Sequence, residues 1–147
     1  MKINFSGNEH ISAGVSKSER FITNPESVSK CIPDSKEFQN TGEHAFSIKV
    51  EVGIGTLKGT FLINGTVEKG QDNSITYRLS GGGFGNKASI LLSIKISGDE
   101  MRTDLSWNAD FDISGIISGL GQGIVKKVSE EKISEIINNV KNVLEAK

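Results

Sequence analysis

Residues 101–111 read Met-Arg-Thr-Asp-Leu-Ser-Trp-Asn-Ala-Asp-Phe, and two kinds of side chain alternate along them almost without exception. The odd positions are mostly apolar and include Met101, Leu105, Trp107 and Phe111, whereas the even positions are all polar. Because successive side chains of a β-strand point to opposite faces, this alternation predicts a strand with one dry and one solvated face. A dry face has to be covered, so the strand requires a second layer.

The same alternation recurs throughout the preceding hundred residues. The expected inward side chains are Ile3 and Phe5, then Phe46, Ile48, Val50 and Val52, then Leu57, Phe61, Ile63 and Val67, then Ile75, Tyr77 and Leu79, and last Phe84, Ala88, Ile90, Leu92, Ile94 and Ile96. From Phe46 onward short turns separate these runs, which leaves no room for the crossovers that parallel strands need. The pattern therefore predicts an antiparallel meander of about six or seven strands.

Helical signals occupy the two remaining parts of the chain. Ser16 or Ser18 is suited to cap a short helix, and Asn24 followed by Pro25 marks the start of a second short helix. The last part of the chain carries an apolar stripe at helical spacing, made of Ile124, Val128, Ile133, Ile136, Ile137, Val140 and Leu144. We expect this long C-terminal helix, firm from about Ile124, to cover the dry face of the sheet. The predicted class is α+β, with one domain over residues 1–147.

Composition and charge exclude several classes of protein. The formal net charge is −1, which offers no excess of positive charge for nucleic acid. The N-terminal residues lack an apolar core of signal-peptide length, which predicts a cytoplasmic protein. No apolar run is long enough to span a bilayer. The single cysteine, Cys31, has no partner for an internal disulfide.

No motif indicates catalysis, a metal or a cofactor. His10 and His44 are better interpreted as solvated histidines, and one cysteine with two distant histidines does not make a zinc site. Asp104 and Asp110 share the outward parity of their strand, where carboxylates keep ordinary pKa values. The glycine-rich run 81–87 fails the phosphate-loop spacing and leads into a strand, so it indicates a bend or hairpin connection.

The stretch 113–125 is the least ordinary part of the sequence, since it contains four glycines and no charge. Glycine in a helix interior costs roughly 1 kcal/mol relative to alanine, so this segment is apolar yet poorly committed to a helix. One interpretation is a tight loop packed on the sheet. The others are a movable gate over the dry face, or an apolar contact for a partner or a membrane surface.

Several pieces of sequence together resemble a known family. They are Phe5-Ser6-Gly7, Asn24-Pro25-Glu26, Cys31-Ile32-Pro33-Asp34, residues 49–53, 57–61 and 79–85, and residues 113–121. In this order they resemble the family of the G subunit of carbon monoxide dehydrogenase, within the START/pollen-allergen-like helix-grip (SRPBCC) superfamily. The family usually has glycine where this chain has Asp34, and its members in carbon monoxide oxidisers often extend into a membrane-anchoring tail.

The resemblance implies a helix-grip fold and a non-catalytic accessory protein without a cofactor. Its expected ligand is hydrophobic, lipid-like or quinone-like, held in a cavity between the sheet and the C-terminal helix. Its expected partner is a molybdenum-dependent enzyme related to carbon monoxide dehydrogenase. The residues predicted to line the ligand site are Val50, Phe61, Ile63, Tyr77, Leu79, Phe84, Ile90, Leu92, Leu105, Trp107, Ile117, Leu120 and Ile124.

Two alternatives remain open on the sequence. An assembly factor that docks on a larger enzyme would expose Ile116, Ile117 and Leu120 as one apolar patch. A helix-grip enzyme would need a titratable group inside the cavity to act as acid or base, such as Tyr77, Cys31 or a carboxylate.

Overall fold

A computed structural model describes residues 1–146; Lys147, the last residue of the predicted domain, lies outside the described residues. Seven strands are present: β1 (Lys2–Ile11), β2 (Ser35–Gly42), β3 (Ala45–Ile54), β4 (Leu57–Lys69), β5 (Ser74–Gly83), β6 (Asn86–Gly98) and β7 (Thr103–Gly115). The helices are α1 (Val15–Ile22), α2 (Pro25–Ser29), the short 3-10 helix η1 (Ile117–Leu120) and α3 (Gln122–Glu145).

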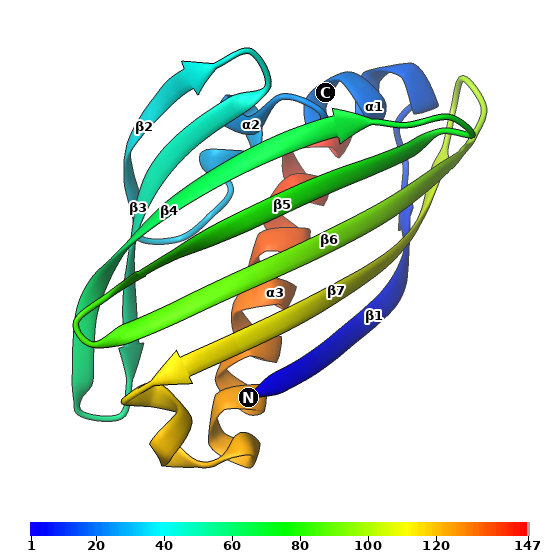
Figure 1. Ribbon diagram of the computed structural model, residues 1–147. Helices are drawn as coiled ribbons and strands as arrows, with labels where there is room; N and C mark the ends of the chain where they lie inside the picture. The colour runs from blue at the N-terminus through cyan, green and yellow to red at the C-terminus, as the bar shows by residue number, and fades with distance from the viewer. Residues whose placement is uncertain (147) are drawn as a thin grey trace.

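The strands form one antiparallel sheet in the order β1-β7-β6-β5-β4-β3-β2. The sheet curves around α3, and α1 and α2 lie at one end of that helix while η1 lies at the other (Figure 1). The first strand of the chain completes the curve by pairing with the last one, with Gly7 opposite Trp107. The predicted helix-grip architecture is confirmed, including the two short helices after the first strand.

The helix α3 is buried only at its two ends. Val125 in its first turn is 1% exposed and Leu144 in its last turn is 2% exposed. Between them, from Lys126 to Val143, no residue is buried. Because a helix that packs tightly on a sheet buries side chains along its whole contact, α3 is fastened most firmly at its ends and contacts the core between them through half-buried side chains such as Val128 and Ile133.

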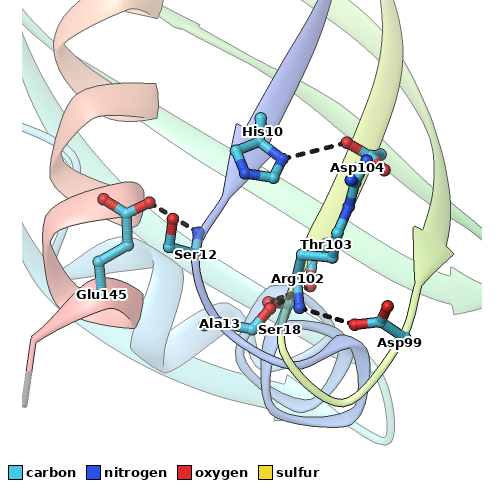
Figure 2. A network of polar contacts seen from close by, with 9 residues as sticks. All are labelled: His10, Ser12, Ala13, Ser18, Asp99, Arg102, Thr103, Asp104 and Glu145. Atoms are coloured by element: carbon cyan, nitrogen blue, oxygen red, sulfur yellow. Dashed lines mark hydrogen bonds and ion pairs between the residues drawn. The ribbon is translucent and has the colours of Figure 1, made fainter.

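A polar network fixes the far end of α3 to the rest of the fold (Figure 2). The backbone N–H of Ser12 donates to the Glu145 carboxylate over 2.7 Å, which joins the end of β1 to the last turn of the helix. Beneath this contact the fully buried Thr103 hydroxyl lies 2.8 Å from the Ala13 carbonyl and 2.9 Å from the Ser18 hydroxyl. A buried hydroxyl with two partners is fully satisfied, so this end is rigidly closed.

Several local expectations about element ends are wrong. The strand β7 continues through Gly115, and α3 begins at Gln122 rather than near Ile124. Gly14 precedes α1 without a side-chain cap, whereas Asn24 caps α2 as predicted, accepting from the N–H groups of Glu26 and Ser27. Met101 lies in a turn and is 79% exposed, so it does not share the inward parity of the strand that follows it.

A further correction concerns the phase of the long helix at its start. Ile124 is 53% exposed, and its neighbour Val125 fills the inward position instead. Four glycines precede this point, so the sequence did not determine where the helix begins. The side of the helix that faces inward in its first turn was therefore not predictable from the apolar stripe alone. Ile124 is therefore not a lining residue of the interior.

Replacement of Leu144 tests whether α3 is fastened at its end. We expect Leu144→Ala to lower the free energy of unfolding by about 2–4 kcal/mol, because it leaves a cavity in a fully buried site. The adjacent Val143 is 49% exposed, so Val143→Ala is a matched control that should change it by less than about 0.5 kcal/mol. Denaturant titration of both variants measures the difference, and equal losses would contradict the anchoring role.

Candidate functional site

The predicted lining residues divide into three groups by burial. Val50, Phe61, Tyr77 and Ile117 are buried. Ile63, Leu79, Phe84, Ile90, Leu92, Leu105, Trp107 and Leu120 are half-buried. Only Ile124 is exposed. None of the predicted strand residues is exposed, and whether these residues bind a ligand stays a prediction.

The buried groups belong to separate clusters rather than to one wall. Val50 and Tyr77 lie in a cluster that packs beneath α1, together with Ile22. Phe61 and Ile117 lie in a second cluster that holds the start of α3. Ile63 and Trp107 touch both clusters and are themselves only half-buried. The middle of the concave face is thus less well covered than its flanks, under the same part of α3 that has no buried residue.

Among the buried side-chain nitrogen and oxygen atoms of residues 1–146, only one lacks a hydrogen-bond partner, and it belongs to Trp107. Its indole Nε1 is buried and has no hydrogen-bond partner within residues 1–146. The pyrrole edge of the ring lies over Gly7, where an added Cβ would stand 2.9 Å from Nε1. Any larger residue at position 7 would displace the indole. Burying a hydrogen-bond donor without a partner costs about 1–3 kcal/mol of stability. An acceptor that bound to Nε1 would recover part of this free energy.

A groove runs between the edge strand β1 and α3, with Trp107 among its lining residues. Its volume is about 550 Å³, and apolar Phe5, Ile133 and Ile137 lie beside polar Glu130 and Asn138. The groove opens onto solvent along β1. The sequence did not predict a groove beside β1. It did predict that Phe5 points inward and that Ile133 and Ile137 belong to the apolar stripe of the helix.

Polar contacts bound the groove at its ends. Near the start of α3 the Gln122 amide donates to the Lys2 carbonyl over 3.5 Å, and at the far end Ser12 is joined to Glu145. The opposite flank of α3 is tied in its C-terminal half, because the Asn139 amide donates to the Cys31 carbonyl over 2.9 Å. Within residues 1–146, polar contacts therefore join α3 to the β1 side at its two ends and leave the stretch between them without one.

At the other end of the sheet a single buried amide joins two loops. Asn86 is 5% exposed, and its side-chain oxygen accepts from the Ile117 N–H over 2.7 Å. Its amide nitrogen donates to the Phe84 carbonyl over 3.1 Å. The Phe84 ring folds back over Gly59, where a Cβ would stand 2.0 Å from it. Asn86 thus fixes η1 to the β5–β6 turn, and no local sequence signal marked it.

The apolar patch expected of a docking factor is only partly present. Ile116 is 56% exposed, but Ile117 is buried at 3% and Leu120 is half-buried. The expectation that Ile117 is exposed is wrong, because the Asn86 contact turns it inward beside Val125.

Titratable groups of the interior are few and are already engaged. The Tyr77 hydroxyl donates to the Ile22 carbonyl over 2.5 Å, and burial raises the pKa of the phenol above its ordinary value. Burial likewise raises the pKa of the Cys31 thiol. Within residues 1–146 no carboxylate or imidazole is buried, and no three His, Cys, Asp or Glu side chains gather to hold a metal ion. The carboxylates and imidazoles thus remain at the surface.

A second hollow, of about 530 Å³, lies on the outer face of the sheet. Arg78, Leu91, Asp110 and Asn4 form one row across β5, β6, β7 and β1 and line it. Its charged groups are exposed to water, so it lacks the enclosure of a ligand site. The interior under α3 is therefore the better candidate.

Residues 7–145 match the family described as the G subunit of carbon monoxide dehydrogenase (CoxG). The chain belongs to this family. The match covers nearly all of the helix-grip fold, from Gly7 in the middle of β1 to the last turn of α3. No curated protein matches the chain. Among the residues that the structure describes, no helix is long and apolar enough to cross a membrane.

Solved structures with the same fold come from several bacteria. A conserved protein from Geobacillus kaustophilus is 19% identical, with a TM-score of 0.87 over 97% of this chain and 95% of that one. A START superfamily protein from Mycobacterium smegmatis is 16% identical, with a TM-score of 0.73 over 97% of both chains. The ZhuI aromatase/cyclase from Streptomyces sp. R1128 is 13% identical, with a TM-score of 0.73 over 99% of this chain and 94% of that one. At these identities the likeness shows the fold alone.

The state of Tyr77 can be tested by titration, because it is the only tyrosine in the chain. Its raised pKa means that the folded chain keeps the phenolic proton at a pH where the unfolded chain, with a pKa of about 10, releases it. Stability from this group is therefore complete below about pH 10 and declines as the pH rises above it. Tyrosinate absorbance should appear only with unfolding, and ionisation at the ordinary pH in a folded chain would contradict the burial.

Proposed function

We propose that this protein binds a hydrophobic small molecule between the concave face of the sheet and α3. One observation carries the proposal: α3 has no buried residue from Lys126 to Val143, directly over half-buried apolar side chains of the sheet. In a domain without a binding site, we expect the layer between the sheet and the middle of its covering helix to be the most deeply buried part. The half-buried Ile63, Leu92 and Trp107 are the surfaces that a ligand would cover.

The unpaired indole of Trp107 supports a ligand with a particular chemistry. Such a ligand has a planar or extended apolar body and one hydrogen-bond acceptor, such as the carbonyl oxygen of a quinone or of a lipid ester. That acceptor would satisfy Nε1, which has no partner within the described chain. A net gain of about 0.5–1.5 kcal/mol is typical for such a bond.

Access to the interior is proposed along the groove between β1 and α3. Nε1 is covered, so an acceptor reaches it only if α3 moves away from β1. The polar contacts of α3 support this direction, since Asn139 holds its other flank to Cys31. A groove volume of about 550 Å³ falls within the range of roughly 300–1,000 Å³ for small-molecule sites.

We infer binding rather than catalysis. The buried Tyr77 hydroxyl is already donated to a backbone carbonyl, and its raised pKa disfavours a role as a base at neutral pH. The buried Cys31 thiol also has a raised pKa, which disfavours a reactive thiolate. Neither group is poised to transfer a proton to a bound molecule.

The family name supports a proposed partner. We propose that the ligand is delivered to, or received from, a molybdenum-dependent enzyme related to carbon monoxide dehydrogenase, in the cytoplasm. This part of the proposal rests on membership of the family and on no contact of the described residues.

Binding of matched ligands tests the role of Trp107. A short-chain naphthoquinone should quench the fluorescence of Trp107, the only tryptophan, and bind more tightly than the corresponding alkylnaphthalene. The expected preference is about three- to tenfold, because only the quinone offers an acceptor to Nε1.

The variant Trp107→Phe keeps an aromatic ring but has no N–H. With affinities measured by equilibrium dialysis, it should bind both compounds with similar affinity. The matched control is Thr103→Val, which also removes one buried polar hydrogen, at the closed far end of the fold, but should keep the preference for the quinone. Loss of the preference in the control, or failure of the wild-type chain to bind either compound, would contradict the proposal.

A further inference from the structure

One end of the molecule combines exposed apolar side chains with unpaired positive charge. It is formed by residues 113–125 together with the β3–β4 and β5–β6 turns, and we refer to it as the η1 end (Figure 1). Ile54 of the first turn packs in the same buried cluster as Ile117 and Val125, which places these segments together.

The apolar part of the η1 end projects into solvent. Ile116 is 56% exposed and Ile124 is 53% exposed, and they are two of the five large apolar side chains that are exposed in residues 1–146. A Cβ added at Gly119, Gly121 or Gly123 would meet no atom within 4 Å. The segment that carries these residues contains no charge. It therefore presents an apolar surface with nothing packed over it.

Five lysines surround this apolar surface. Lys87 lies opposite Ser114 in the β6–β7 pair, and the Lys2 carbonyl is joined to Gln122 at the start of α3. Lys126 and Lys127 follow in the first turns of α3, and Lys58 follows the β3–β4 turn. All five side chains are exposed, and none forms an ion pair within the part of the chain that the structure describes.

The five lysines outnumber the carboxylates nearest to them on β7 and α3, which are Asp112 and, one helical turn beyond Lys126 and Lys127, Glu130 and Glu131. The formal net charge of the protein is −1, so the cluster of free lysines is not a consequence of a basic composition. Asp112, the nearest carboxylate along β7, lies 3.7 Å from the amino group of Met1 and is partly neutralised by it. Other lysines, such as Lys36, Lys49 and Lys132, are paired with carboxylates.

We propose that the η1 end docks on the surface of an anionic lipid bilayer. Exposed isoleucines would enter the interfacial region, while the lysines around them would contact anionic headgroups, a combination typical of peripheral membrane-binding surfaces. The long lysine side chains can cover apolar surface and still place their ammonium groups at headgroup level. This docking goes beyond binding of a ligand in the interior and does not depend on it.

The test is flotation of the full chain with vesicles of phosphatidylcholine alone and of phosphatidylcholine mixed with phosphatidylglycerol. We expect binding to the mixed vesicles only, weakened by added salt. The variant Lys126→Gln/Lys127→Gln should bind about fivefold more weakly for each lysine removed. The variant Ile116→Ser/Ile124→Ser should lose at least about tenfold in affinity, because it removes the apolar contact.

Two control variants lie away from the η1 end. Lys30→Gln/Lys95→Gln removes two exposed lysines that have no ion pair within residues 1–146, and Met101→Ser removes the most exposed large apolar side chain, in the β6–β7 turn. Both should bind mixed vesicles within about twofold of the wild-type chain. Equal losses in the controls, or no binding of the wild-type chain to mixed vesicles, would overturn the proposal.

Two further measurements separate this proposal from the others. Binding of the naphthoquinone without vesicles reports on the interior alone, so a chain that binds it but ignores vesicles overturns only the docking. Light scattering after size-exclusion chromatography reports on self-association. A dimer that is lost in Ile116→Ser/Ile124→Ser would assign the η1 end to a second copy of the chain and would also overturn membrane docking.

Discussion

The structure depends on how one helix covers the dry face of a seven-stranded sheet. An antiparallel sheet with one apolar face has to bury it, and here the 24-residue helix α3 does so together with α1, whose Ile22 packs with Val50 and Tyr77. The helix is fixed where Val125 and Leu144 enter the core, at its two ends. Between these points α3 lies over the concave face of the sheet, and none of its residues from Lys126 to Val143 is buried.

This incomplete cover gives the interior its chemical character. The half-buried side chains are apolar, and the exception is the Trp107 indole N–H, which has no partner in the described chain. The buried side chains of Asn86 and Thr103, by contrast, have hydrogen-bond partners. An unpaired buried donor on β7, one strand in from the edge of the sheet, is the feature that most distinguishes this interior from an ordinary core.

The fold was predictable from sequence because strand parity is a local property. The alternation around Trp107 and Tyr77 predicted their strands correctly, and the order of short motifs identified the family. Strand β2 was not predicted, because only Phe38 provides an inward apolar side chain there. A register shift beside Glu37, whose φ is 53°, also breaks the alternation. The groove and its closures were not predictable, because they arise when distant segments meet. Lys2 and Gln122 are joined only after β1 completes the sheet, and nothing in the local sequence of Trp107 tells whether its N–H finds an acceptor.

The central claim is that the space beneath α3 holds a hydrophobic molecule. The most direct measurement is native mass spectrometry of the protein purified gently from its own host, followed by extraction into organic solvent. The account predicts a mass excess close to one ligand per chain, which disappears on extraction and yields a lipid-like or quinone-like compound. A chain of bare mass that also takes up none of a panel of apolar compounds would contradict it.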